Sequence, residues 1–243
     1  MLPTPRFFFN CLLCYVFLAG CQLSSSYTLS GYKWPQPDGL GTEIEVSYSF
    51  SNLLDGGFNT VLPNSELKEI VVEAFGLWSG VAPLAFVEVD SPVSHHYSNI
   101  EIGYRTFDPL YASAIAFYPA SIDDALSGDI FFANNINDPY VWGKNTGVGD
   151  DPFELDVLEV LVHEIGHSLG LGHEFEADAI MNPTIGNRFS GSDTGYLLQD
   201  DIAGIQAIYG KRRSPQAVSD ASLRGFAPVV LGLLFVVRRL ARR

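Results

Sequence analysis

The order of apolar and polar positions predicts strands and one helix in the first part of the chain and helices in the last part. Apolar residues alternate with polar ones from Thr42 to Phe50, which is the period of a half-buried strand. After Pro63-Asn64-Ser65, apolar residues recur at helical spacing up to Trp78. Short apolar runs predict further strands at residues 84–89, 100–104, 115–117 and 129–132.

The rest of the pattern predicts a loop followed by two helices. Residues 134–152 are rich in Asn, Asp and Gly, so we expect a loop there. Helices are expected from about Phe153 to Leu171 and from about Leu198 to Tyr209, where Gly210 stops the last one. Strands and one helix therefore precede two helices. The predicted class is α/β or α+β, in a single domain over residues 27–210.

The N-terminal residues 1–20 predict a signal peptide. Arg6 precedes an apolar run from Phe7 to Leu18, which is short for a membrane span. The run ends in Leu18-Ala19-Gly20-Cys21, which resembles the lipobox of bacterial lipoproteins, and we expect Cys21 to be lipidated. The alternative is ordinary cleavage after a small residue.

The C-terminal residues predict a linker at 211–225 and, at 226–243, a short hydrophobic segment with a basic tail. An apolar run that ends in arginines loosely resembles bacterial sorting signals that are later removed, and a permanent tail anchor is the alternative. Either arrangement keeps the arginines cytoplasmic and the body outside. We therefore expect an exported protein, located in the cell envelope as a lipoprotein or outside the cell.

Composition and charge exclude some classes of protein. The chain is 47% hydrophobic and 17% charged, which favours a globular fold. Residues 31–210 carry five basic and 27 acidic groups, whereas residues 211–243 have a net charge of +7. The strong negative charge of residues 31–210 argues against nucleic-acid binding. All three cysteines lie within the first 21 residues, so the body has no disulfide.

Three of the five histidines lie in or just after the second-last predicted helix. His163 and His167 are four residues apart, so two imidazoles on one helix face can reach one Zn²⁺. Glu164 follows the first of them and can point at a water in the open fourth position. Gly170 readily takes a positive φ, so the chain can leave the helix there and bring in His173 as the third ligand. Three protein ligands are typical of a catalytic zinc, and the alternative is a helix with three surface histidines.

The longer motif, with Gly170 and His173, is the metzincin signature, and the chain resembles the matrixins, the matrix-metalloproteinase branch of that group. Met181 resembles the residue that gives the Met-turn its name. The similarity to minimal bacterial matrixins implies a twisted, mostly parallel sheet, three helices and a zinc at the active-site helix. Four further segments resemble matrixins: Gly31–Trp34, Ala74–Ser79, Pro83–Val89 and Asp200–Gly210.

The resemblance implies a zinc metalloendopeptidase that acts on extracytoplasmic proteins or peptides. Glu164 would be the general base, and the segment after Met181, including Asn182, Pro183 and Thr184, would wall an S1′ pocket. We expect a monomer that contacts the membrane through the lipid on Cys21, the C-terminal segment or both. The alternative is an inactive surface binding or adhesion module on the same fold. The intact Glu164 and histidines favour the enzyme.

The chain also departs from the matrixin pattern. Ile115 and Phe131 stand where matrixins carry histidines for a second, structural zinc, so we expect one catalytic zinc only. Ala133 and Ile136 occupy usual acidic positions of a calcium site, so its ligands are partly missing and calcium binding stays open. We also expect no cysteine switch to block the zinc. The two remaining histidines predict a polar loop pair: His95 and His96.

Overall fold

The computed structural model describes residues 26–90, 100–106, 112–119, 125–134, 141–144, 154–176, 178–183 and 197–212. These residues contain seven strands and three helices. In chain order they are β1 (Ile44–Phe50), α1 (Asn64–Val81), β2 (Leu84–Glu88), β3 (Ile100–Arg105), β4 (Ala114–Ala116), β5 (Ile130–Ala133), β6 (Val141–Gly143), β7 (Glu154–Asp156), α2 (Val157–Ser168) and α3 (Gln199–Tyr209).

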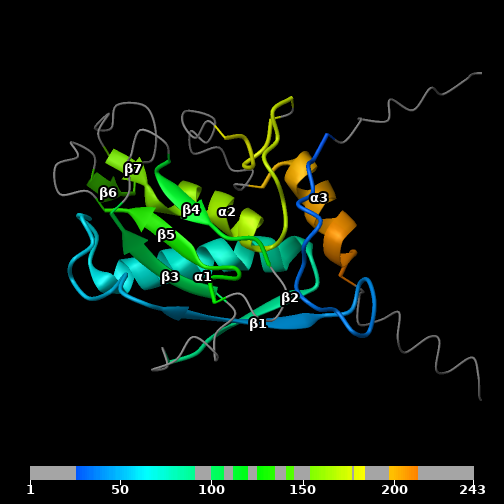
Figure 1. The fold of residues 1–243 in the computed structure, drawn as a ribbon, viewed down its shortest axis with the longest axis horizontal. Helices are drawn as coiled ribbons and strands as arrows, with labels where there is room; N and C mark the ends of the chain where they lie inside the picture. The colour runs from blue at the N-terminus through cyan, green and yellow to red at the C-terminus, as the bar shows by residue number, and fades with distance from the viewer. Residues whose placement is uncertain are drawn as a thin grey trace, which may run out of the picture.

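Five strands form one sheet in the order β2-β1-β3-β5-β4. Neighbouring strands are parallel except β4, which runs antiparallel to β5 at the sheet edge. Helices α1 and α2 contact each other and the sheet, and Figure 1 shows them side by side behind it. Helix α3 contacts α1. The mostly parallel sheet with three helices confirms the predicted fold class.

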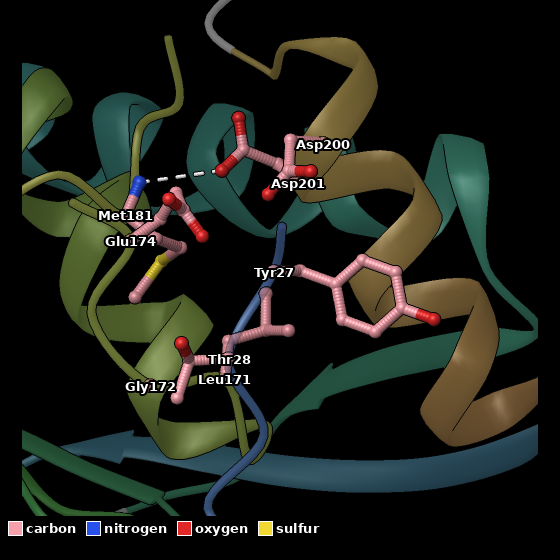
Figure 2. Close-up of a pocket in the computed structure, with 8 residues that line it drawn as sticks. All are labelled: Tyr27, Thr28, Leu171, Gly172, Glu174, Met181, Asp200 and Asp201. Atoms are coloured by element: carbon pink, nitrogen blue, oxygen red, sulfur yellow. Dashed lines mark hydrogen bonds between the residues drawn. The ribbon is translucent and has the colours of Figure 1, made fainter. Parts of the chain in front are cut away.

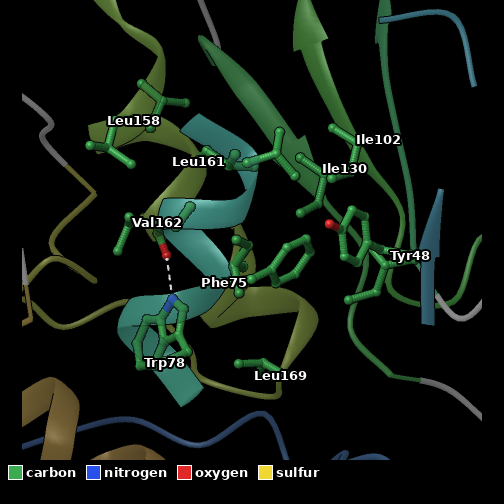
Figure 3. Packing of buried hydrophobic residues seen from close by; sticks show 14 of the residues in the cluster. Tyr48, Phe75, Trp78, Ile102, Ile130, Leu158, Leu161, Val162 and Leu169 are labelled. Carbon is green, nitrogen blue, oxygen red and sulfur yellow. Dashed lines mark hydrogen bonds between the residues drawn. The ribbon is translucent and has the colours of Figure 1, made fainter. Parts of the chain in front are cut away.

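The core between the helices and the sheet fixes the position of α2. Apart from Glu159, every residue of α2 is buried, including the polar residues His163, Glu164, His167 and Ser168. The fully buried Trp78 of α1 donates its indole N–H to the carbonyl oxygen of Val162, 3.1 Å away (Figure 3). On the sheet side of α1, the Phe75 ring lies 4.5 Å from the ring of Tyr48 in β1. The helix that carries two of the candidate ligands is therefore anchored to α1, which itself packs on the sheet, and α2 also contacts β4 and β5.

Two predictions around α2 were wrong. The stretch predicted as a loop contains strand β6. This strand pairs in parallel with β7, which occupies residues that were expected to form the first turn of the helix. The helix begins only at Val157 because Asp156 caps it: the carboxylate accepts the N–H groups of Leu158 (2.8 Å) and Glu159 (3.1 Å). It ends at Ser168, three residues earlier than expected, because the chain turns at Gly170, whose φ is +105°.

Several predicted features lie outside the described residues. They are the signal peptide, Cys21, His95, His96, Ile136, Thr184 and the hydrophobic C-terminal segment. Of the helices in the described ranges, none combines the length and the apolar character that crossing a membrane requires.

Candidate metal centre

The structure brings the three predicted ligands together. His163 and His167 project from α2, with ring centroids 4.7 Å apart, and His173 comes from the loop that follows. Its ring centroid lies 5.3 Å from that of His163 and 4.7 Å from that of His167. One ligand atom from each residue can be chosen so that all three lie within 4.8 Å of one another. Such a cluster can hold a metal ion with three imidazole ligands.

Backbone carbonyl groups orient two of these rings. The Nδ1 atom of His163 lies 2.6 Å from the carbonyl oxygen of Ile180, and Nδ1 of His167 lies 2.8 Å from that of Leu171. A carbonyl oxygen only accepts hydrogen bonds, so Nδ1 carries the proton in both rings. The Nε2 lone pair of each ring then remains available to a metal, the usual outer-shell arrangement for metal-binding histidines.

Burial sets the protonation of the candidate centre. It lowers the pKa of His163 to about 4 and that of His167 to about 3, and it also lowers the pKa of His173. All three imidazoles are therefore neutral at pH 7, which is the form that binds metal. Burial alone raises the pKa of Glu164, which is only 4% exposed, to about 8, whereas a cation held by the adjacent histidines would favour the ionised carboxylate.

A tight turn carries the chain from α2 to His173. Gly170 adopts a positive φ, and a side chain there would collide with the carbonyl oxygen of Tyr32. The N-terminal segment packs along this turn: the N–H of Ser30 donates to Gly170 O (2.9 Å), and the N–H of Gly172 donates to Thr28 O (2.8 Å). The third ligand is thus positioned by a turn that needs glycine and by the segment that precedes β1.

The Met-turn, residues 179–183, connects the parts of the centre. Ile180 accepts the His163 hydrogen bond, and the carbonyl oxygen of Met181 accepts the N–H of Glu174, 2.9 Å away, next to the third ligand. Asp201 of α3 accepts the N–H groups of Ile180 (2.9 Å) and Met181 (3.2 Å). Figure 2 shows the second of these bonds, with Glu174 beside Met181. The turn therefore links two ligand-bearing segments to α3.

The side chain of Met181 packs against α2 between the two helical ligands. Gly166 lies there, and a Cβ atom on it would collide with the Met181 sulfur and lie 3.2 Å from Cζ2 of Trp78. Absence of a side chain at position 166 therefore allows the Met-turn to approach the helix. Met181 is 2% exposed, so this contact between the turn and the helix is buried.

The other predicted site residues differ in how they are placed. Glu164 lies on α2 directly after His163 and is buried. Asn182 is buried, its N–H donating to Ala179 O (3.2 Å), whereas Pro183 is exposed. Thr184 lies outside the described residues, so the proposed S1′ wall is described only in part.

Sequence reasoning missed several residues that build the centre. Asp156 could have been found, because Asp156-Val157-Leu158-Glu159 has the pattern of a helix N-terminus. The role of Asp201 follows only from the folded chain, since its partners Ile180 and Met181 are about 20 residues away. The carbonyl acceptors for the histidines have no side-chain signal at all. The edge-on contact between the rings of Tyr118 and His167, whose centroids are 5.7 Å apart, also has no signal in the sequence.

The two residues that the resemblance puts at structural-zinc positions are apolar and face each other across neighbouring strands. Ile115 of β4 pairs directly with Phe131 of β5. The rings of Phe131 and Phe117 meet edge-on, with centroids 6.4 Å apart. The guanidinium carbon of Arg105 lies 3.4 Å from the centroid of the Phe131 ring. Neither Ile115 nor Phe131 offers a ligand atom. Within the described ranges, the three histidines are the only His/Cys/Asp/Glu group close enough to hold a metal.

Comparison with known proteins gives a consistent result. The family model described as Matrixin matches residues 41–210. Matrix metalloproteinase-16 of Homo sapiens is 30% identical over 192 residues, which are 76% of this chain and 28% of that protein. Matrix metalloproteinase-18 of Xenopus laevis is 33% identical over 167 residues, 65% of this chain and 32% of that protein. Interstitial collagenase B of Mus musculus is 30% identical over 188 residues, which are 75% of this chain and 36% of that protein. The chain spans about a third of the length of these relatives.

Proposed function

Because this chain belongs to the matrixin family, we propose that it is a zinc-dependent metalloendopeptidase that cleaves extracytoplasmic proteins. The observation that carries the proposal is the arrangement of the histidines. Their ligand atoms lie within 4.8 Å of one another, and two of the three rings are turned by backbone carbonyls so that Nε2 is free. A purely structural cluster of histidines would not need this orientation.

Zinc is the metal that the residues fit best. Three neutral imidazoles are a donor set that catalytic zinc sites use, and His163, His167 and His173 would be its ligands. A bound zinc ion would polarise the carbonyl of the scissile peptide bond and make water at the open position more acidic. We propose one zinc per chain.

Glu164 is the proposed general base. Its carboxylate is buried beside the first ligand and is the only acidic side chain in α2 between the two histidines. It would accept a proton from the attacking water as the water oxygen bonds to the carbonyl carbon. It would then deliver that proton to the amine that leaves when the C–N bond breaks, so no net proton is gained or lost.

The substrate would bind in an extended conformation along β4. This strand is at the edge of the sheet, paired with β5 on one side only, and it contacts α2. The S1′ pocket beside the metal would be walled by Asn182, Pro183 and Thr184. These residues immediately follow Met181, which packs against the ligand-bearing helix.

Export and anchoring form a separate part of the proposal. We propose that residues 1–20 are removed, that Cys21 is lipidated, and that the monomeric protein is held at the membrane surface by this lipid or by the C-terminal segment. Mass spectrometry of both termini of the mature protein tests this. An unacylated N-terminus at another residue would refute the lipoprotein assignment and leave the peptidase assignment intact.

Replacement of the base tests the catalytic proposal. Glu164→Gln keeps the size of the side chain and removes the proton acceptor, so we expect retained zinc and peptidase activity lower by at least about 10²-fold. Cleavage of a denatured proteome, with and without a zinc chelator, measures the activity. Glu73→Gln, at an exposed position of α1, is the matched control and should behave as wild type.

The two candidate functions predict different results for the wild-type protein. Chelator-sensitive cleavage that Glu164→Gln abolishes supports the peptidase. Absence of cleavage by zinc-loaded wild type would instead favour the inactive binding module, and equal activity in Glu164→Gln would exclude Glu164 as the base.

A further inference from the structure

Two aromatic side chains from different segments lie against the candidate ligands. Tyr118, which follows β4, meets His167 edge-on, with ring centroids 5.7 Å apart and an interplanar angle of 90°. Phe175, two residues after the third ligand, meets His173 in the same manner, at 6.1 Å and 86°. The cluster of imidazoles is thus bordered by an aromatic ring at two of its three members.

Both rings are open to solvent. Tyr118 is 39% exposed, and Phe175, at 70%, is the most exposed large apolar side chain of the described residues. Single exposed apolar residues are common on protein surfaces and need no special explanation. Here, however, two of them contact the same small cluster, where a reacting peptide bond must bind. Exposed aromatic surface at such a place is available to a ligand.

We propose that Tyr118 and Phe175 are specificity-determining walls of the substrate cleft, which bind an apolar side chain, preferably aromatic, next to the scissile bond. The proposal rests on the peptidase function proposed above. A carbonyl group that reaches the metal brings its neighbouring side chains to within reach of rings that touch the ligands. A substrate side chain packed on either ring would shield its exposed face from water and make aromatic contacts.

The chemistry of the two walls favours an apolar occupant. The ring of Phe175 has no polar atom, and the ring of Tyr118 packs against His167 by its aromatic surface. Lysine or arginine could still stack on an aromatic ring, so a preference for basic residues is the main competing outcome.

The cleavage preference of the full-length, zinc-loaded protein tests the inference. Denatured-proteome peptides are digested with wild type, Tyr118→Ala, Tyr118→Phe, Phe175→Ala and the control Val72→Ala, which removes exposed apolar surface from α1. We expect wild type to favour apolar and aromatic residues at one position next to the cleaved bond. The two alanine variants at the walls should lose roughly 3- to 10-fold of this preference in relative kcat/KM. Zinc content and cleavage next to small residues should be unchanged.

The remaining variants separate the ring from its hydroxyl group. Tyr118→Phe keeps the ring, so it should retain the wild-type preference, as should Val72→Ala. The inference is overturned if both wall variants keep the wild-type preference, if the preference is for basic residues, or if Tyr118→Phe is as impaired as Tyr118→Ala. Wild-type cleavage without any preference next to the cleaved bond refutes the inference alone. Absence of wild-type cleavage refutes it together with the proposed function.

Discussion

The C-terminal part of α2 and the β4–β5 edge are held in place by different kinds of contact. At the end of α2, the histidines place polar atoms in a largely buried setting, where hydrogen bonds to Ile180 and Leu171 fix the rings. At the β4–β5 edge, Ile115 and Phe131 pair across the strands, and the Arg105 guanidinium covers the Phe131 ring. The first region is preorganised to hold an ion, whereas the second is held by apolar and cation–π contacts.

This difference corresponds to the two kinds of zinc site that the resemblance to matrixins implies, one catalytic and one structural. The ligands that chemistry requires are present in this chain, and the surrounding backbone orients them. Where a metal would only join strands, buried side chains can provide the contact energy instead. We therefore predict that the chain needs no second ion to keep β4, the proposed substrate-binding edge, next to β5.

The largest expected effect comes from removing the apolar contact at the β4–β5 edge. Phe131 is 3% exposed, so Phe131→Ala should lower the free energy of unfolding by about 3–5 kcal/mol, measured by chemical denaturation. Phe175→Ala makes the same change at an exposed position and should cost less than about 0.5 kcal/mol. Equal losses in the two variants would show that the edge is not held by burial of Phe131.

A smaller effect is expected where the Met-turn packs against α2. Gly166→Ala places a methyl group against the Met181 sulfur, and this overpacking should cost about 1–3 kcal/mol in unfolding free energy. Gly76→Ala in α1 is the matched control, because a Cβ atom there meets nothing within 4 Å. It should be neutral or stabilising by up to about 1 kcal/mol. A neutral Gly166→Ala would mean that close approach of the Met-turn is not required.

The smallest effect concerns the carboxylate that holds the Met-turn. Burial raises the pKa of Asp201 to about 6, against the effect of its bonds from the N–H groups of Ile180, Leu198 and Met181. With the pKa raised in the folded state, stability is greatest below the unfolded-state value of 3.8 and falls as pH rises through 6. Between pH 7 and pH 5, wild type should therefore gain about 1 kcal/mol relative to Asp201→Asn, which cannot titrate.

Denaturation of both proteins at the two pH values measures this difference. Groups that titrate in both proteins, including the histidines, contribute equally and cancel in the comparison. A difference that stays constant, or that favours Asp201→Asn at pH 5, would contradict the assigned protonation of Asp201.

The sequence was most informative where side chains with special chemistry recur at fixed spacing. The i, i+4 histidines and Gly170 were sufficient to predict the ligand cluster, because helix geometry and the freedom of glycine determine where such residues lie. The alternation before Phe50 and the helical spacing up to Trp78 likewise predicted β1 and α1, apart from small errors at their ends.

The features that the sequence did not reveal depend on contacts between distant segments. Strand β6 is short and lies in a polar stretch, and it becomes recognisable only through its pairing with β7. The bonds from Ile180 and Met181 to Asp201, and the ring contacts of Tyr118 and Phe175, depend on tertiary packing. Local spacing carries no information about them.

Zinc stoichiometry tests the central difference between the two regions most directly. Elemental analysis of the full-length protein after exhaustive dialysis should give one zinc per chain, and His167→Ala should retain almost none because a ligand is lost. His96→Ala, which removes a histidine that is not part of the 163–173 sequence motif, should retain one. Two zinc ions in wild type, or one zinc that His167→Ala still holds after dialysis, would contradict the assignment of a single ion to the end of α2.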